Sequence, residues 1–549
     1  MKKQSFIFSS AILILSAVVT KLMGAFFRIP LANMLGGTGM GYFSGAYGIF
    51  MAVYAVSVTG LPTAVAKLVA ENSALGQYGN IRKIKHTALG FFGITGLIFS
   101  VLLIMCAYPF CLLTSGTEAV PSVLMIAPSI FFCCATSVYR GYYEGLRNMF
   151  PTAFSQIVEG LFKLGAGLAF CIYVIRNPEK YDGVSRIFGN CSIISIAAAA
   201  AVLGITVSSA MGMVFLIARD KICGDGISEE QIYLSGNQND DNRSIINQLI
   251  KIALPVAAGA LVTNLTSVVD LVTITSAIEM AVRKAPDYFI SLSVTENIHD
   301  LPNFMFGSFT GLAVTVFNLI PSFTNMFGKG ILPNLSEAFA TQNKAAIKAN
   351  TEKALISTAL IAFPAGAGIC ALSENILQFL FPSRIAETRI CASSLSILGI
   401  AVMFLCISST AFSILQAAGK PQIPVRIMLA GVAAKLIGNL ALVAVPEINI
   451  NGAAMSTLLC YIIICIVTLY YIIKLTDIAF VKLFVVFCKI CYCSVICALS
   501  ANLTRNILSN AVGTSFVLII SILCGVIFYI ICAYLLGIFT KSTLKLLIS

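Results

Sequence analysis

Long apolar stretches, separated by short polar segments, recur along almost the whole chain. A hydrocarbon core about 30 Å thick is crossed by a helix of about 20 apolar residues, and transmembrane barrels lack such continuous runs. The pattern therefore predicts an all-α polytopic membrane protein with about 14 transmembrane helices. The predicted spans are residues 6–29, 40–61, 87–110, 120–139, 152–175, 187–217, 247–275, 303–327, 354–380, 391–417, 424–445, 451–473, 482–502 and 512–539.

An internal repeat divides the chain into two lobes. Residues 18–22 resemble residues 261–265, and residues 152–163 align with residues 424–435. Because six spans per repeat is an even number, both copies point the same way, and a pseudo-two-fold axis along the membrane normal should relate them. The predicted parts are an N-terminal six-helix lobe (1–218), a cytoplasmic linker (219–246), a C-terminal six-helix lobe (247–476) and two additional transmembrane helices (477–549).

The basic residues fall mainly in alternate connections. The chain has 549 residues, of which 58% are hydrophobic and 11% charged, with a formal net charge of +12. If the N-terminus is inside, the cytoplasmic connections hold most of the Lys and Arg, as the positive-inside rule requires. We therefore predict that both termini are cytoplasmic. The positive charge reflects orientation, and no nucleic-acid partner is expected.

Two cations interrupt the first apolar run, and both lie on one helix face. Lys21 and Arg28 are two helical turns apart, with Gly24 between them. A charge at the centre of a membrane helix costs about 2.5–3.5 kcal/mol by insertion scales. One explanation is that these side chains snorkel to the headgroups, since Arg28 lies near one end of the run. The functional interpretation is the cationic wall of an internal cavity that holds an anionic ligand.

Lys163 and Lys435 occupy matching positions in the two repeats, and Glu159 lies one turn before Lys163. If the lobes face each other, both lysines point toward a shared axis and extend the cationic wall. Glu159 and Lys163 could equally form a structural i,i+4 ion pair. With Lys21 and Arg28, these residues form the predicted substrate-binding set, because intramembrane charges must face water, a partner or a ligand.

Asp270 lies in the seventh predicted span, with Asn264 six residues before it. Intramembrane carboxylates often mark ion pathways. The two side chains are therefore candidates for a coupling-ion site that takes sodium or a proton. Asp270 could instead pair with Arg28 across the lobes, and both alternatives stay open at this point.

The sequence contains no recognisable catalytic set. It has no Walker-type loop, no two-histidine metal motif and no soluble segment of domain size. Its 18 cysteines lie mostly within apolar runs, where free thiols behave as small hydrophobes. We therefore predict a protein that is not an enzyme, with no metal site and no cofactor.

Seven short motifs carry a resemblance to a known family. They are residues 20–24 (TKLMG), 28–32 (RIPLA), 60–62 (GLP), 66–71 (AKLVAE), 140–145 (RGYYEG), 148–153 (NMFPTA) and 155–159 (SQIVE). These motifs resemble those of the stage V sporulation protein B group of oligosaccharide flippases, and the resemblance covers nearly the whole chain. This group belongs to the multidrug/oligosaccharidyl-lipid/polysaccharide exporter superfamily and is similar to the lipid II flippases of peptidoglycan synthesis.

The resemblance implies a V-shaped transporter of the bacterial cell membrane that works by alternating access. Such a protein flips an undecaprenyl-pyrophosphate-linked oligosaccharide, lipid II or a related cell-wall precursor, from the inner to the outer leaflet. Cations on the first helix of the lipid II flippases face the cavity, and Lys21 and Arg28 match them. Glu144 stands where the group usually has Gln. Lys163 stands where it usually has Arg, which keeps the charge but loses a bidentate fork.

Two other functions remain as alternatives. A cation-coupled multidrug exporter of the same superfamily would usually have acids in its cavity, whereas this chain has more bases. A membrane-embedded glycan polymerase would need a large external connection, and residues 277–302 contain several acidic side chains. The predicted partners are a lipid-linked anionic sugar, membrane lipids and a coupling cation, and a monomer is expected.

Overall fold

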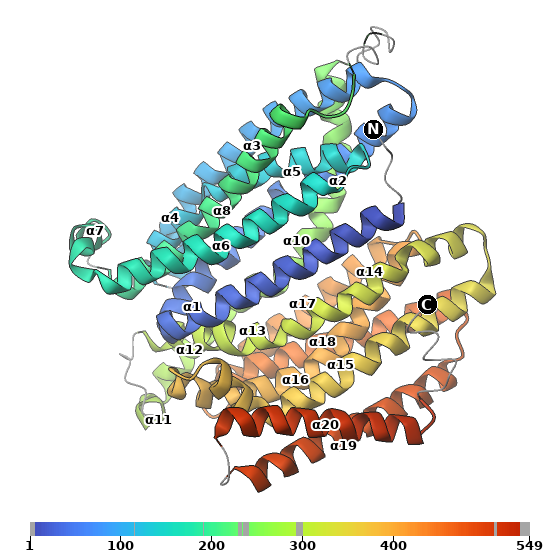
Figure 1. Ribbon diagram of the computed structural model, residues 1–549. Coiled ribbons are helices and arrows are strands. Elements are labelled where there is room, and N and C mark those ends of the chain that lie inside the picture. The colour runs from blue at the N-terminus through green and yellow to red at the C-terminus, as the bar shows by residue number, and fades with distance from the viewer. Residues whose placement is uncertain are drawn as a thin grey trace. The chain divides into compact units, whose positions relative to one another are not determined.

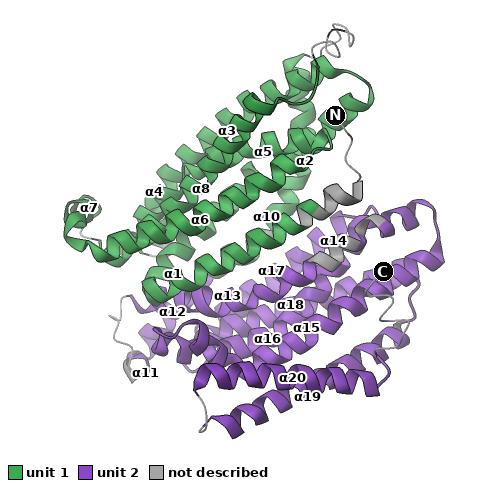
Figure 2. Ribbon diagram, in the orientation of Figure 1, with its two compact units in different colours: residues 1–272 green, residues 273–549 purple. Residues whose placement is uncertain are grey.

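The structure is a computed structural model that describes residues 6–114, 116–189, 191–228, 233, 241–291, 300–509 and 513–538. Every regular element in these ranges is helical (Figure 1). The chain forms two compact units, residues 1–272 (unit 1) and 273–549 (unit 2), coloured separately in Figure 2. Parts of the predicted linker and of the C-terminal tail, residues 229–232, 234–240 and 539–549, lie outside the described residues.

Among the described residues, 14 helices are long and apolar enough to cross a membrane. This number confirms the predicted all-helical, polytopic fold. The helices divide differently from the predicted spans at two places. The stretch Leu15–Ala74 joins most of the first predicted span to the whole of the second. The seventh predicted span lies in a longer helix that contributes two candidates, Asn242–Val262 and Asn264–Lys284.

Unit 1 begins with a long helix that glycine interrupts. The elements of the unit are α1 (Phe6–Ser57), α2 (Leu61–Ala74), α3 (Tyr78–Leu113), η1 (Thr117–Ala119), α4 (Val120–Ile126), α5 (Ser129–Gly145), α6 (Phe150–Arg176), η2 (Pro178–Tyr181), α7 (Asp182–Ile187), α8 (Ile193–Cys223) and the first part of α10 (Asn242–Lys284). At about 1.5 Å per residue, α1 is far longer than one bilayer crossing. Gly36 divides it with a φ of 67°, a conformation that glycine adopts without strain.

Small residues let the helices of unit 1 approach closely. Gly204 of α8 lies directly against the backbone of Gly167 in α6, and the two helices run side by side (Figure 1). Gly60, just before α2, lies in the same way against the backbone of Ala253 in α10. Close backbone contact at small residues is how helices associate where lipid removes the hydrophobic driving force. The first part of α10 therefore belongs to unit 1, and the boundary between the units falls inside this helix.

Unit 2 contains the rest of α10 and the later helices. Its elements are α11 (Pro286–Ser291), α12 (Leu301–Ser308), the π-helical turn η3 (Phe309–Ala313), α13 (Val314–Phe317), α14 (Leu319–Ala340), α15 (Lys344–Leu380), α16 (Ile385–Ala417), α17 (Gln422–Leu442), α18 (Asn451–Thr476), α19 (Phe480–Leu508) and α20 (Thr514–Leu535). The last two helices pack against each other and against α15. The hydroxyl of Tyr529 in α20 donates to the carbonyl of Leu360 in α15 at 2.9 Å, which fixes this pair on the unit.

Candidate functional site

Two of the predicted cations meet at one aromatic ring in unit 1. The guanidinium carbon of Arg28 lies 5.6 Å from the ring centroid of Tyr47. The ammonium of Lys163 lies 5.4 Å from the same centroid and 5.4 Å from that of Phe27. Arg28 and Tyr47 come from the two sides of the Gly36 bend in α1, and Lys163 comes from α6. The bend and the packing of α6 on α1 therefore place two like charges against the same ring.

Tyr47 belongs to a row of aromatic side chains along the second half of α1. Successive ring centroids in this row are 5.6–6.1 Å apart, from Phe43 through Tyr47 and Phe50 to Tyr54. An aromatic face attracts a cation by about 0.5–2 kcal/mol, depending on desolvation. Within this row, Tyr47 is the ring that lies against both Arg28 and Lys163 and stabilises their charges. The sequence analysis did not single out Tyr47, because its role depends on the bend.

Lys21 lies on the same helix as Arg28, about 10 Å away along the axis. Its side chain is exposed, and Arg28 is half-buried. Gly24 lies between them, and a Cβ added there would meet no atom within 4 Å. The face of α1 that carries Lys21, Gly24 and Arg28 is therefore open beside the glycine.

Glu159 pairs with an arginine that the sequence analysis had placed in a connection. Its Oε1 lies 2.9 Å from Nη2 of Arg140 in α5, and the Nε of Arg140 donates to the hydroxyl of Ser155 at 2.9 Å. The ion pair found at Glu159 is thus to α5 and not to Lys163 on its own helix. Gly212 of α8 leaves the space that the Glu159 side chain fills, so three helices meet at this pair.

Lys435 lies in unit 2, on α17, and its side chain is buried with 4% exposed. One turn later on the same helix, the amide of Asn439 donates to the hydroxyl of Thr273 at 2.8 Å, and the hydroxyl of Ser456 donates to the amide oxygen of Asn439. Lys435 is therefore part of a polar interior in unit 2. The other predicted substrate-binding residues belong to unit 1.

The two residues of the predicted coupling-ion site lie on α10. The amide of Asn264 donates to the backbone carbonyl of Ala260 at 2.9 Å, and Asp270 is half-buried. Residues six apart on a helix point about 120° away from each other. The side chains of Asn264 and Asp270 therefore leave the helix in different directions, and the coupling-ion site stays a prediction.

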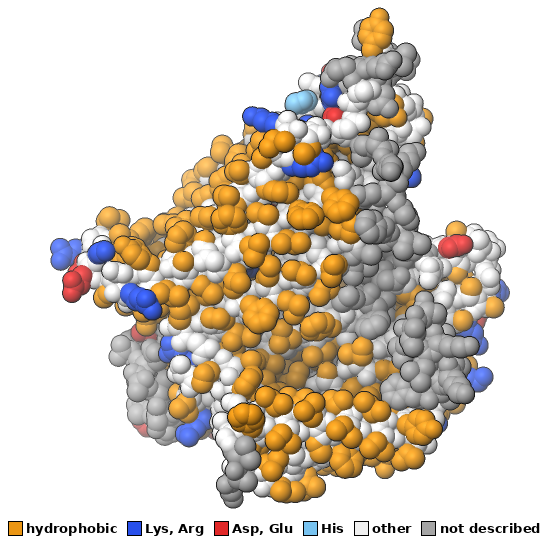
Figure 3. All heavy atoms as spheres, viewed as in Figure 1, with side chains coloured by type: hydrophobic (Ala, Val, Ile, Leu, Met, Phe, Trp, Pro, Cys, Tyr) orange, Lys and Arg blue, Asp and Glu red, His pale blue; other side chains and the backbone are white. Residues whose placement is uncertain are grey.

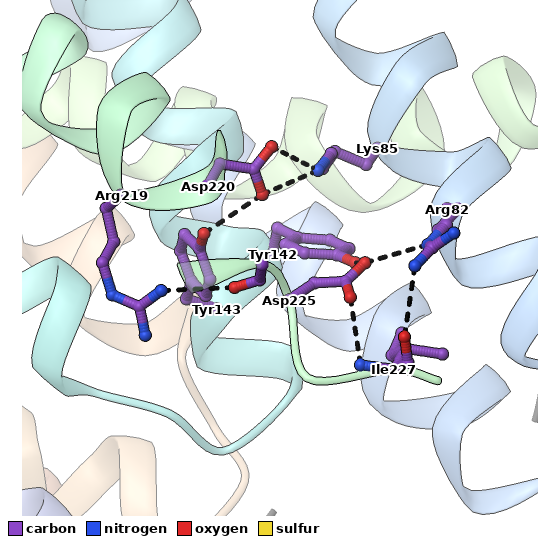
Figure 4. A network of polar contacts seen from close by, with 9 residues as sticks. Arg82, Lys85, Tyr142, Tyr143, Arg219, Asp220, Asp225 and Ile227 are labelled. Carbon is purple, nitrogen blue, oxygen red and sulfur yellow. Dashed lines mark hydrogen bonds and ion pairs between the residues drawn. The ribbon is translucent and has the colours of Figure 1, made fainter. Parts of the chain in front are cut away.

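A second polar cluster ties the end of α8 and the segment after it to α3 and α5 (Figure 4). The ammonium of Lys85 lies 2.7 and 2.9 Å from the two carboxylate oxygens of Asp220, which also accepts from the hydroxyl of Tyr143 at 3.1 Å. Asp225 accepts from Arg82 at 3.1 Å and from Tyr142 at 2.9 Å. The sequence analysis missed these contacts because they join distant segments.

The carboxylate of Asp225 is held ionised by this cluster. Burial alone would favour the neutral acid, but hydrogen bonds from Arg82, from the backbone N–H of Ile227 and from Tyr142 hold the pKa of Asp225 below its usual value. A carboxyl group with a lowered folded-state pKa stabilises the fold above its unfolded pKa, about 3.9. This stabilisation is lost as the pH falls through the folded-state pKa.

We expect Asp225→Asn to reduce the free energy of unfolding by about 2 kcal/mol at neutral pH, because hydrogen bonds to a charged group are replaced by neutral ones. The difference from the unaltered protein should shrink below pH 4, where the aspartate itself becomes protonated. Thermal unfolding of purified protein between pH 7 and pH 3 measures this effect. Asp241→Asn is the matched control, since Asp241 is exposed and should cause no change. An Asp225→Asn deficit that is constant with pH would contradict the ionic account.

The chain is similar to a known protein family and to two proteins of Bacillus subtilis. The model of a family described as polysaccharide biosynthesis protein matches residues 8–339. Stage V sporulation protein B of Bacillus subtilis (strain 168) is 25% identical over 471 residues, covering 83% of this chain and 81% of the relative. Lipid II flippase MurJ of the same organism is 22% identical over 462 residues, covering 82% and 79%.

The fold is also similar to a solved structure. The inward closed conformation of a lipid II flippase MurJ superposes with a TM-score of 0.65 and 15% identity, covering 96% of this chain and 98% of that chain. At this identity the likeness concerns the fold alone. The resemblance predicted from the motifs of the sequence is thus confirmed by the family match, by the curated relatives and by the fold.

Proposed function

Because the chain belongs to the family of polysaccharide biosynthesis proteins, we propose that it flips a lipid-linked saccharide with a pyrophosphate group across the bacterial cell membrane. The cargo class is an undecaprenyl-pyrophosphate-linked oligosaccharide, such as lipid II or a related cell-wall or polysaccharide precursor. The proposed direction is from the inner to the outer leaflet. The name of the relative lipid II flippase MurJ supports the cargo class.

The observation that carries this proposal is the meeting of Arg28 and Lys163 at Tyr47. Two cations held at one ring repel each other, and an anion bound beside them removes that repulsion. A pyrophosphate supplies about two negative charges and many acceptor oxygens, and charge-assisted hydrogen bonds to such oxygens are the strong kind. A cationic drug would gain nothing from this arrangement, which argues against the multidrug-exporter alternative.

Each predicted substrate-binding residue has a role in the proposal. Arg28 offers a planar fork to two phosphate oxygens, and Lys163 and Lys21 act as additional point charges. Lys435 supplies the corresponding charge from the second repeat. Glu159 ties α6 to Arg140 of α5, and so positions the turn of α6 that ends at Lys163.

The proposed cycle is alternating access between the two six-helix lobes, residues 1–218 and 247–476, in a monomer. A coupling cation at Asp270 and Asn264, or the membrane potential, resets the carrier. Each elementary charge that crosses the field contributes about 2.3 kcal/mol per 100 mV. Return of an empty cationic site toward the cytoplasm is favoured by an inside-negative potential.

The orientation in this proposal puts both termini in the cytoplasm. The cluster of Lys85, Arg82, Asp220 and Asp225 then lies at the cytoplasmic end of unit 1, where the positive-inside rule places basic residues. Cys223 is exposed at the end of α8. Labelling of Cys223 by an impermeant thiol reagent in intact cells would contradict this orientation.

Transport by purified protein in vesicles tests the proposed function. We expect a fluorescent undecaprenyl-pyrophosphate saccharide, added to one leaflet, to reach the other leaflet at a rate well above that of protein-free vesicles. The rate should fall when the membrane potential and the ion gradients are both collapsed. A protein that moves a cationic dye but not the lipid-linked saccharide would support the multidrug-exporter alternative, and one that extends the saccharide chain would support the polymerase alternative.

A further inference from the structure

A small apolar pocket lies at the end of unit 1 opposite the cluster of Lys85 and Asp220. Its volume is about 280 Å³, close to the lower end of small-molecule pockets at about 300–1,000 Å³. Phe170 and Tyr173 of α6 line one side, and Ala200 and Leu203 of α8 line the other. Phe188, which follows α7, also lines the pocket. Pro121 and Met125 of α4 complete the lining, so the pocket lies between α4, α6, α8 and the short segment that connects α6 to α8.

The walls of the pocket match a hydrocarbon chain. Its lining residues are aliphatic or aromatic, apart from the hydroxyls of Tyr173 and Tyr181. Phe170 is 37% exposed and lies about 9 Å from the last residue of α6 along the helix axis. In a membrane this side of the unit meets lipid, so the natural occupant is part of a lipid chain. The small volume suits a segment of a single unbranched chain.

A cation is held beside the pocket by one of its lining residues. The ammonium of Lys180 lies 5.4 Å from the ring centroid of Tyr173 and donates to its hydroxyl at 3.2 Å. The ring of Tyr181 meets that of Tyr173 edge-on, with centroids 6.4 Å apart. Tyrosines at the membrane interface place an apolar ring in lipid and a hydroxyl among the headgroups. The Tyr173–Lys180 contact thus puts a positive charge at headgroup level.

The surrounding segment is charged and solvent-accessible. Arg176 and Arg186 are exposed, as are the carboxylates of Glu179 and Asp182. With Lys180, the segment therefore carries three positive and two negative charges. Figure 3 shows charged side chains gathered at the tip formed by this segment, next to an apolar face of the same unit. Ile187 at the end of α7 is 79% exposed, which suits a segment that rests on the membrane surface.

We propose that this pocket, between α4, α6, α8 and the segment 177–189, is a binding site for an anionic membrane phospholipid. One acyl chain enters the apolar pocket, and the phosphate of the headgroup meets Lys180. The site is distinct from Arg28 and Lys163, and it does not depend on which saccharide the protein carries. A lipid bound there would fix the connection between α6 and α8.

The chain contains no tryptophan, so a single introduced one is a clean reporter. Phe170→Trp places the indole in the pocket wall, and phospholipids with brominated chains quench it on contact. We expect brominated phosphatidylglycerol to quench this indole at about fivefold lower mole fraction than brominated phosphatidylcholine, as expected for one cation near an anionic headgroup. Met105→Trp, at a position on α3 that is 75% exposed, reports ordinary surrounding lipid and should be quenched equally by both.

Two further changes in the Phe170→Trp protein separate the headgroup from the pocket. Lys180→Ala should remove the preference for phosphatidylglycerol, whereas Lys344→Ala, an exposed lysine at the start of α15, should keep it. Ala200→Phe should fill the pocket and weaken quenching by both lipids. If that variant does not fold, the pair of lysine variants still decides the question.

Several results would overturn the proposal. Equal quenching of Phe170→Trp by both brominated lipids would rule out recognition of an anionic headgroup. A preference for phosphatidylglycerol that survives Lys180→Ala would rule out the proposed contact between the phosphate and Lys180. Unlabelled undecaprenyl phosphate and unlabelled phosphatidylglycerol can each be added as a competitor of the brominated lipid. If only undecaprenyl phosphate relieves the quenching at the same lipid-to-protein ratio, the pocket binds the polyprenyl tail of the cargo. Because the assay measures lipid binding alone, a failure here leaves the transport proposal intact, and a failure of transport leaves this result intact.

Discussion

Replacement of Arg28 by alanine is expected to abolish transport while the protein stays folded in the membrane. Arg28 and Lys163 both lie against Tyr47, and the proposed pyrophosphate binds beside them. Loss of one hydrogen-bonded charge costs about 1.5–3 kcal/mol, or roughly 10-fold to 100-fold in affinity. Complementation of a flippase-deficient bacterial strain should therefore fail with Arg28→Ala and with Lys21→Ala. Membrane abundance, measured by immunoblot, should remain near normal.

Graded substitutions at the same site separate charge from geometry. Arg28→Lys keeps the charge but loses the bidentate fork, so complementation should be intermediate between the unaltered protein and Arg28→Ala. Lys435→Ala should also give intermediate complementation, because the second repeat has no acid at the position that matches Glu159. Lys489→Ala is the silent control, since its ammonium donates to the carbonyl of Leu536 at an exposed position in unit 2. Full complementation by well-expressed Lys21→Ala and Arg28→Ala proteins would show that the cations do not bind the cargo.

The helical membrane fold could be predicted from the sequence because a run of apolar residues is what a helix needs to lie in lipid. Runs of about 20 apolar residues had to be membrane helices, and the structure contains them. The bend of α1 could not be read from composition alone, since Pro30 and Gly36 both lie near the break and only Gly36 takes the unusual φ. The place of Tyr47 next to Arg28 depends on this bend. The contact of Arg28 and Lys163 with the ring of Tyr47 therefore could not be predicted from spacing along the sequence.

Ion pairs were harder to predict than helices, because spacing along the sequence reveals only local partners. The i,i+4 rule offered Lys163 as the structural partner of Glu159. The structure pairs Glu159 with Arg140, which comes from the preceding helix. Lys163 is thereby left to the rings of Phe27 and Tyr47. In the same way, Asp220 and Asp225 belonged to a segment that looked like a solvated linker, yet tyrosines and cations from two other helices hold them in place.

The Arg140–Glu159 pair should be highly sensitive to single substitution. Both side chains are largely buried, with 15% and 25% exposed. Removing one member of a buried ion pair leaves an uncompensated charge, which costs about 3–5 kcal/mol. Arg140→Ala should therefore lower both the thermal midpoint of the purified protein and its abundance in the membrane. Glu159→Ala should have a similar effect, because it leaves the guanidinium of Arg140 without its carboxylate.

The double variant Arg140→Met/Glu159→Leu distinguishes a structural pair from a functional one. Apolar residues of similar volume often replace a buried ion pair with little loss of stability, so abundance and thermal midpoint should recover. Transport should nevertheless remain impaired, because Glu159 no longer positions the turn of α6 that carries Lys163 toward Tyr47. Gly212→Ala offers an independent check, since a Cβ there meets the Glu159 side chain and should disturb the pair without removing a charge. Stable double-variant protein that transports normally would assign the pair to folding alone and remove Glu159 from the site.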